Sequence, residues 1–315
     1  MEILYSDISP EANTTSVTAV ISPPPSGPLV GLPASHVVRT WSRMSSLQAD
    51  AEDVLGTLKA NEYDGNQWLV ILDLTKNAVE QLGSHENGLR GVPYRFQYEG
   101  TAGIIKIILG YAHEYCTAEF STAINDQLAA MGIARNDRSW GGGTLYSTPY
   151  SNRGKEADQI FTPFNRRPSG GIIDWPSLVI ETGVSESYKK LQADASWWFE
   201  NSHGRVRIVI LIILNKNYVR WEKWQLVPLN APTPLTRGYL NQLRQQVPNI
   251  PPLTAQPAVA PRPYSAQEVL NTPTSVTGAP MMIPFEALYD RGRGPTETDV
   301  IITAQDFRDI ANTCF

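Results

Sequence analysis

The sequence predicts an α/β protein in which helices flank a mixed β-sheet. Three observations support this fold class: one long stretch with apolar residues at every fourth position, several short runs of apolar and β-branched residues, and the alternation of these two patterns along the chain. The chain has 315 residues, of which 42% are hydrophobic and 18% charged. This length and balance suffice for one or two domains with a substantial core.

The long stretch covers residues 102–131 and predicts a single helix. No proline interrupts it, and Gly132 follows as a suitable C-terminal cap. The apolar residues that recur along one side are Ile104, Ile108, Ala112, Cys116, Phe120, Ile124 and Leu128.

Strand-like patterns lie on both sides of this stretch. Residues 68–72 and 94–98 precede it as one buried and one half-buried strand. The elements expected after it are strands at 144–150, 157–162 and 177–182, a helix at 187–201 that stops at Gly204, and strands at 206–214 and 218–227. Three strands, a crossover helix and a strongly apolar strand at 206–214, which we expect to be central, predict a mixed sheet with helices on its faces.

Proline and polar residues predict the domain limits. Residues 1–50 are expected to be a mostly disordered N-terminal segment, because Ser, Thr and Pro dominate residues 6–38. An α/β domain is expected at residues 60–227 and a proline-rich linker at 228–273. The C-terminal segment, residues 274–315, contains one predicted helix at 304–312 and is expected to pack on the core.

Charge and cysteine content exclude some classes of protein. The net charge of −5 lacks the overall basic character of many nucleic-acid-binding proteins, although residues 151–227 carry a net +3. The chain has two cysteines, so we expect neither a disulfide framework nor a zinc site, and Cys116 is expected to be a buried free thiol. There is no secretory signal or membrane-length apolar run, which predicts an intracellular protein, cytoplasmic or nuclear, without a membrane partner.

Two acids at the ends of apolar strands are the best candidates for chemistry. Asp158 precedes Gln159-Ile160-Phe161, and Glu181 follows Leu178-Val179-Ile180. An acid at the end of a buried strand needs compensation for its charge, and two such acids on neighbouring strands can share a divalent cation that activates water. The alternative is that each acid closes its strand at the solvent edge.

Several short motifs, taken in their order, resemble a known superfamily of nucleases. They are His113-Glu114, Lys155-Glu156-Ala157-Asp158, Pro176 followed by Glu181-Thr182-Gly183-Val184-Ser185-Glu186-Ser187, Asp194-Ala195-Ser196-Trp197-Trp198, and Ile283-Pro284-Phe285-Glu286. Together they resemble the PD-(D/E)XK, or restriction-endonuclease-like, superfamily, and more closely a fungal branch of it. The resemblance implies a core of the order αβββαβ.

The resemblance also implies a set of site residues, with one departure. The metal-binding acids would be Asp158, where Ala157 replaces the usual proline, and Glu181. Gly183 stands where the superfamily has its catalytic lysine, so that lysine would have to come from elsewhere. Lys189 and Lys190 open the following helix, and Lys155 is a third option.

Of these lysines we favour Lys190, which shares a helix face with Asp194 one turn on. The alternative for Lys189 and Lys190 is a solvated first turn. Lys155 stands at an odd spacing from Asp158, which on a regular strand would place it on the opposite face.

The long helix would contribute Glu114, which could equally be a surface glutamate. The expected catalytic set is therefore Glu114, Asp158, Glu181 and Lys190, with Mg²⁺ or Mn²⁺ held by Asp158 and Glu181. The predicted function is a metal-dependent nuclease that cleaves DNA or RNA. One alternative is a catalytically inactive protein of the same fold that acts as a binding or interaction module. Another is an interaction protein that presents proline-rich stretches such as residues 257–263 as ligands.

Overall fold

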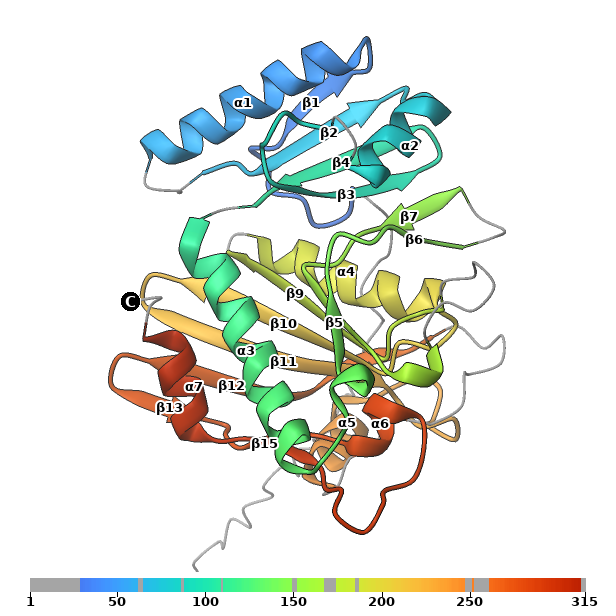
Figure 1. The fold of residues 1–315 in the computed structure, drawn as a ribbon, viewed down its shortest axis with the longest axis vertical. Coiled ribbons are helices and arrows are strands. Elements are labelled where there is room, and N and C mark those ends of the chain that lie inside the picture. The colour runs from blue at the N-terminus through green and yellow to red at the C-terminus, as the bar shows by residue number, and fades with distance from the viewer. Residues whose placement is uncertain are drawn as a thin grey trace, which may run out of the picture.

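The computed structural model describes residues 29–61, 65–85, 88–108, 110–148, 152–166, 174–184, 187–246, 251 and 261–312. Within these ranges the chain is a mixed α/β protein built on two large sheets, one above the other in Figure 1. Two 3-10 turns, η1 (Arg135–Asp137) and η2 (Phe164–Arg166), connect elements of the larger sheet.

The smaller of these sheets has six strands in the order β1-β2-β4-β3-β7-β6. We call this sheet and its two helices the N-terminal module. Its elements are β1 (Val37–Thr40), α1 (Met44–Ala60), β2 (Trp68–Leu72), α2 (Lys76–Ser84), β3 (Tyr94–Glu99), β4 (Ala102–Ile107), β6 (Tyr146–Ser147) and β7 (Arg153–Lys155).

Side chains alternate across the six-stranded sheet, which gives it two different faces. Leu69, Phe96 and Ile105 pack under α1 and α2 in one apolar cluster. The intervening residues point the other way, toward the second sheet. Two of them, Gln97 and Lys106, therefore reach the rest of the molecule as buried polar side chains.

The second sheet has seven strands in the order β13-β12-β11-β10-β9-β8-β5. Only β9 and β10 are parallel to each other; the other paired neighbours are antiparallel. The strands are β5 (Ser139–Gly141), β8 (Gln159–Thr162), β9 (Leu178–Val184), β10 (Ile208–Asn215), β11 (Tyr218–Leu226), β12 (Pro263–Thr272) and β13 (Ser275–Thr277).

Two helices cover opposite faces of the seven-stranded sheet. α3 (Gly110–Ala130) packs on one face, where Phe120 joins Ile180 and Ile210 in one cluster. α4 (Tyr188–Asn201) packs on the other face, where Trp198 meets Val179 and Leu211. β10 is fourth of the seven strands, so the prediction that residues 206–214 form a central strand is confirmed.

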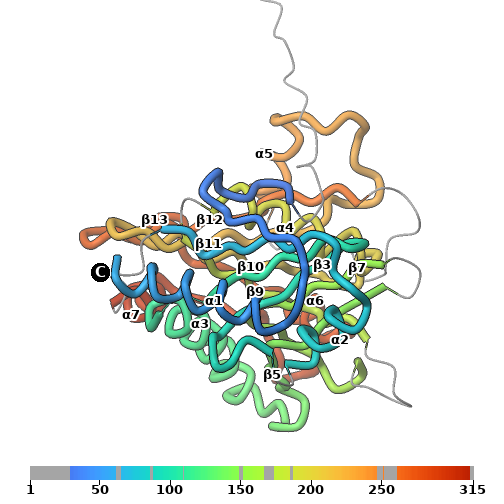
Figure 2. Tube along the Cα trace, turned by 90° about the horizontal axis from the view of Figure 1, so that it is seen from above, coloured from blue at the N-terminus to red at the C-terminus, as the bar shows by residue number. Residues whose placement is uncertain are grey.

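The C-terminal part packs on the α3 side of this sheet. Phe285, Ile302 and Phe307 belong to the same core cluster as Phe120. Besides β12 and β13, the elements after β11 are α5 (Arg237–Gln245), the two-stranded sheet of β14 (Met281–Ile283) and β15 (Val300–Ile302), and the helices α6 (Phe285–Tyr289) and α7 (Ala304–Ala311). Figure 2 shows α7 beside α3 and α5 apart from both.

Several local predictions differ from the structure. The predicted helix at 102–131 is a strand, β4, followed by α3, because the Ile-rich start of the stretch pairs with β2 and β3. Of the predicted strand at 144–150, the structure describes residues 144–148; of these, residues 146–147 form a strand, which pairs with β7 in the N-terminal module. The strand at the edge of the larger sheet is instead β5, at residues 139–141.

The segments expected to be loose contain regular structure where they are described. β1 and the start of α1 fall within residues 1–50, although residues 1–28 lie outside the described part. α5 and β12 fall within residues 228–273, where a linker was expected. Of the proline-rich stretch 257–263, residues 257–260 lie outside the described part of the chain.

Cys116 is buried on α3, as predicted, but it is disulfide-bonded rather than a free thiol. Its bonding partner lies outside the described residues. None of the described helices combines the length and the apolar character that crossing a membrane requires.

Candidate functional site: a buried acid–lysine centre

The strand register brings the two predicted acids together. β8 runs antiparallel to β9 with Gln159 opposite Ile180, so Asp158, one residue before β8, stands at the level of Glu181. The backbone N–H of Thr182 donates to Asp158 Oδ2 at 2.8 Å. Asp158 and Glu181 therefore stand on adjacent strands, as expected, but Glu181 lies in the middle of β9 (Leu178–Val184) rather than at its end.

A lysine from the N-terminal module holds Asp158. Lys106 Nζ, on β4, donates to Asp158 Oδ2 at 2.7 Å and to the carbonyl oxygen of Thr182 at 2.5 Å. Nε2 of His113, on α3, is 3.4 Å from the same Asp158 oxygen, Oδ2. Nε of Arg95, on β3, is 3.6 Å from Asp158 Oδ1. Asp158 is therefore surrounded by three basic side chains, two of them from the N-terminal module.

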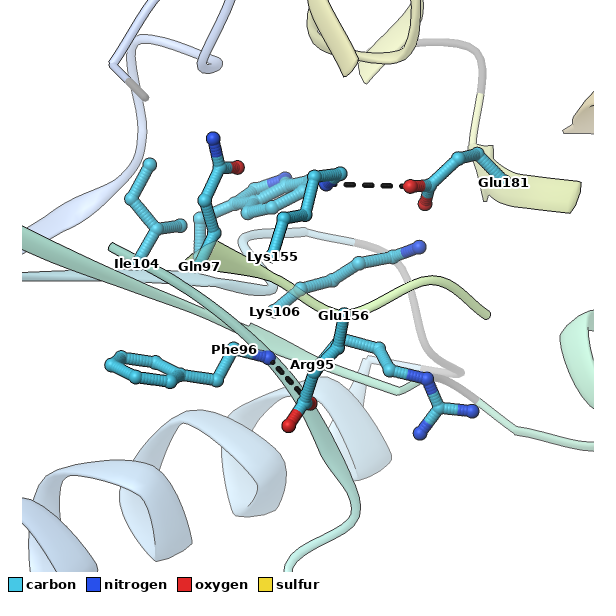
Figure 3. A pocket seen from close by; sticks show the side chains of 9 residues that line it. Arg95, Phe96, Gln97, Ile104, Lys106, Lys155, Glu156 and Glu181 are labelled. Carbon is cyan, nitrogen blue, oxygen red and sulfur yellow. Dashed lines mark hydrogen bonds and ion pairs between the residues drawn. The ribbon is translucent and has the colours of Figure 1, made fainter. Parts of the chain in front are cut away.

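A second lysine lies between Glu181 and an acid of α4. Lys155 Nζ, at the end of β7, is 3.4 Å from Glu181 Oε1 and 3.1 Å from Asp194 Oδ1. Figure 3 shows the Lys155–Glu181 contact across the space between the two sheets. Trp198 Nε1 donates to the same Glu181 oxygen at 2.7 Å. Each of the two predicted metal ligands thus has a lysine of its own.

The third lysine is Lys190, which the sequence analysis favoured as the catalytic lysine. One helical turn separates it from Asp194, and the two form a close ion pair, as their spacing predicted. Its Nζ also donates to Gln97 Oε1 of β3 at 2.9 Å. The side chain is 0% exposed, so the alternative of a solvated first turn is wrong for Lys190, whereas Lys189 is exposed.

These six residues form what we call the acid–lysine centre: Asp158, Glu181, Asp194, Lys106, Lys155 and Lys190. All six are buried. Three carboxylates face three ammonium groups, so the centre is electrically balanced by protein side chains. The space beside Lys106, Lys155 and Glu181 has a volume of about 10 Å³ (Figure 3), at the lower limit for a single water molecule.

Burial and neighbouring charges compete over the protonation of the acids. Burial alone would raise the pKa of Asp158, but the charges of Lys106 and His113 outweigh it and hold that pKa well below its usual range. Asp194 follows the same pattern, with Lys155 and Lys190 lowering its pKa against burial. For Glu181 burial dominates and raises the pKa, although Lys155 opposes it.

The lysines and the histidine respond to the same two effects. Burial would lower the pKa of Lys155, but Asp194 and Glu181 raise it above its usual value. Burial lowers the pKa of Lys190 to about 8 against the attraction of Asp194. The pKa of His113 is raised, because Asp158 outweighs the effect of burial. The attraction of the acids thus outweighs burial for Lys155 and His113, whereas burial prevails for Lys190.

The donor set does not suit a divalent cation. Within the part of the chain that the structure describes, no group of three or more His, Cys, Asp or Glu side chains is placed to hold a metal ion. The positions beside Asp158 and Glu181 that a cation would take are filled by Lys106 and Lys155. A divalent cation would add two positive charges to a balanced and nearly closed space.

Helix α3 contributes a different residue from the one predicted. Glu114 is 61% exposed in its side chain, and its nearest basic atom is His113 Nδ1 at 3.7 Å, too far for a hydrogen bond. The structure therefore leaves Glu114 outside the centre and places His113 next to it, beside Asp158. The sequence signal for this was the buried polar row His113, Thr117 and Ser121, spaced four residues apart along α3.

The sequence analysis missed Lys106 and underrated Lys155. Lys106 lay within the stretch predicted as helix, so its place on a strand face was hidden. The odd spacing of Lys155 from Asp158 placed it on the opposite face of a regular strand, but the strand breaks between them. β7 ends at Lys155 and pairs with β3, whereas β8 begins at Gln159 in the other sheet.

The glycine at the usual lysine position has a packing reason. A Cβ atom on Gly183 would lie 3.3 Å from both terminal methyl carbons of Leu191, on α4. A longer side chain there would press on the contact between β9 and α4, so Gly183 fits the close approach of this helix.

Glu156 points away from the centre, into the N-terminal module. Its Oε2 accepts from the backbone N–H of Phe96 at 2.9 Å, and its Oε1 lies 2.9 Å from His85 Nε2. Burial raises the pKa of Glu156 to about 8, and burial, followed by the charge of Arg95, lowers that of His85. Both pKa shifts are consistent with a hydrogen bond in which a protonated Glu156 donates to a neutral His85.

Replacing Glu156 with glutamine is expected to stabilise the protein at high pH. The pKa of Glu156 is about 8 in the folded protein and 4.5 without perturbation. The neutral side chain therefore contributes its full stabilisation below pH 4.5, and this stabilisation is lost as the pH rises toward 8. Glutamine copies the neutral acid and does not ionise. Thermal unfolding of Glu156→Gln and wild type should diverge in favour of the variant between these two pH values; parallel curves would contradict the raised pKa.

A comparison of the sequence with protein-family models and with curated proteins gives no match. The structure alone therefore defines the class of this protein: it is a mixed α/β protein with a buried, charge-balanced acid–lysine centre between two sheets.

Proposed function

We propose that this chain is a catalytically inactive protein of nuclease-like fold that acts as a binding or interaction module. The observation that carries the proposal is the compensation of Asp158 and Glu181 by buried lysines, Lys106 and Lys155. A phosphodiesterase needs these acids free to hold a metal and reachable by a substrate. Here they stabilise the contact between the two sheets instead.

The proposed fold type is the restriction-endonuclease-like core. In its favour is the order of α3, β5, β8, β9, α4 and β10, a helix followed by three antiparallel strands, a second helix and a strand parallel to the third. The short strands β6 and β7 interrupt this order and join the N-terminal module. The motif resemblance around Asp158 and Glu181 points to the same fold.

A metal-dependent nuclease is the second candidate, with DNA or RNA as substrate and Mg²⁺ or Mn²⁺ as cofactor. It is favoured by one observation: Asp158 and Glu181 stand at the same level on neighbouring strands with Lys155 next to Glu181. Activity would require Lys106 and Gln97 of the N-terminal module to withdraw from the acids and Lys190, while Lys155, on β7 of the same sheet, stays beside Glu181.

A cleavage assay separates the two candidates. Plasmid DNA, single-stranded DNA and RNA are incubated with Mg²⁺ or Mn²⁺ and with wild type, Asp158→Asn or Glu181→Gln, each checked for folding by circular dichroism. We expect wild type to show no cleavage beyond that of the Asp158→Asn and Glu181→Gln variants. Cleavage by wild type that is lost in both folded variants would overturn the proposal and establish the nuclease.

A further inference from the structure

An open polar groove lies on the α3 side of the larger sheet, away from the acid–lysine centre. Its lining residues lie on the second half of α3 and on the segment that leads through η1 into β5, and its volume is about 420 Å³. Figure 1 shows the course of these two segments. The residues that line it are Ser121, Thr122, Asn125, Arg135, Arg138 and Trp140. Two of these six side chains are cationic and none is acidic.

The two arginines differ in how they are held. Arg138 is fixed, because its Nε donates to the carbonyl oxygen of Ile133 at 3.0 Å and its Nη1 to Asn125 Oδ1 at 3.2 Å. These bonds leave Nη2 of Arg138 without an acceptor among the described residues. Arg135 is exposed, and its side chain makes neither a hydrogen bond nor an ion pair with any residue in the described ranges. The groove thus has one preorganised guanidinium and one free guanidinium.

The acid of the same turn is already used elsewhere. Asp137 Oδ1 accepts from the backbone N–H of Phe164 at 2.7 Å, which ties the carboxylate to the start of η2 rather than to the arginines. Trp140 forms an aromatic wall of the groove, and its ring packs edge-on against Phe161 at 5.1 Å. Guanidinium groups bind phosphate oxygens, and an indole ring stacks on an aromatic base, so the two together suit a ligand that carries a phosphate and an aromatic ring.

We propose that this groove binds the phosphate of a nucleotide, with Arg135 and Arg138 as the anion-binding groups and Trp140 as the surface for the base. Guanidinium groups favour phosphate because they donate two parallel hydrogen bonds to its oxygens. The chain has a net charge of −5, so the attraction must come from this local pair of cations. The site is separate from the acid–lysine centre and does not depend on whether that centre is catalytic.

The nucleotide could be free or part of a single strand, and one titration series distinguishes these sources. A labelled oligothymidylate is titrated with the full-length protein by fluorescence anisotropy at several salt concentrations, and unlabelled thymidine monophosphate is titrated by calorimetry. Binding of the oligonucleotide alone assigns the groove to a strand. Binding of the monophosphate with comparable affinity assigns it to a free nucleotide.

Arg135→Ala is the test variant and Arg237→Ala the matched control. Both arginines are exposed, and Arg237 opens α5, far from the groove in sequence. Loss of one charged hydrogen-bond donor should weaken binding about tenfold or more and reduce the salt slope by about one. Arg237→Ala should bind as wild type does. The proposal is overturned if neither probe binds at millimolar concentration, or if Arg135→Ala and Arg237→Ala bind equally.

Discussion

Replacing Lys190 with alanine is expected to lower the free energy of unfolding by about 3–5 kcal/mol, the usual cost of removing one partner from a buried ion pair. Lys190 is fully buried and contacts Asp194 and Gln97. Without it, Asp194 keeps Lys155 as its cationic partner, and Gln97 loses the donor to its amide oxygen. Chemical denaturation of the purified variant measures the loss.

The neighbouring lysine provides the control. Lys189→Ala removes the same side chain one position earlier on α4, but from an exposed site, so its effect should stay within about 0.5 kcal/mol of wild type. Equal stability of Lys190→Ala and Lys189→Ala would show that Lys190 does not occupy the buried position described here.

Asp158→Asn should lower the free energy of unfolding at least as much as Lys190→Ala does. Asparagine keeps an oxygen for the backbone N–H of Thr182 but removes the charge that compensates Lys106 and that lies beside His113. We expect a loss of about 3–5 kcal/mol in the free energy of unfolding near neutral pH. The pKa of Asp158 is lowered, so its contribution is present above its unperturbed value of 3.8 and is lost as the pH falls below it.

Urea titrations at neutral and acidic pH check this result. The stability difference between wild type and Asp158→Asn should shrink as the medium becomes acidic. Asp53→Asn makes the same chemical change on the exposed side of α1 and should leave stability unchanged at both pH values. A constant difference across the pH range would mean that the charge of Asp158 is not compensated in the folded protein.

The larger sheet could be predicted from the sequence because its strands carry strong local patterns. Residues 208–214 are all Ile, Val or Leu, and such a run is typical of a strand buried on both faces. The helix at 188–201 and its end at Gly204 followed from the same kind of evidence, and Gly204 has the positive φ of 77° expected at a helix terminus. Local pattern and tertiary structure agree in these elements.

β4 could not be separated from α3 because its pattern fits two structures. Ile104 and Ile108 continue the four-residue spacing of α3 backwards, yet Ile105 and Ile107 also alternate with Lys106 as a strand requires. Pairing with β2 and β3, which come from other parts of the chain, decides between them. Local spacing does not contain that information.

The acids of the centre were predictable, and most of their partners were not. Asp158 and Glu181 stand out as charges at the ends of apolar strands. Lys106 reaches Asp158, and Gln97 reaches Lys190, only because the N-terminal module covers this part of the larger sheet. Figure 3 shows Gln97 and Lys106 on the same side of the pocket. A contact between residues so distant in sequence leaves no spacing signal, so the sequence analysis named Lys155 and Lys190 but not Lys106, the lysine that compensates Asp158.

The most direct test of the central claim is a calorimetric titration of the wild-type protein with Mn²⁺ near neutral pH. The claim is that side-chain lysines already neutralise the acid–lysine centre, so we expect no saturable binding at millimolar Mn²⁺. Saturable binding at one site, abolished in a folded Glu181→Gln variant, would contradict it. That result would mean that Lys106 and Lys155 yield their places to a metal ion held by Asp158 and Glu181.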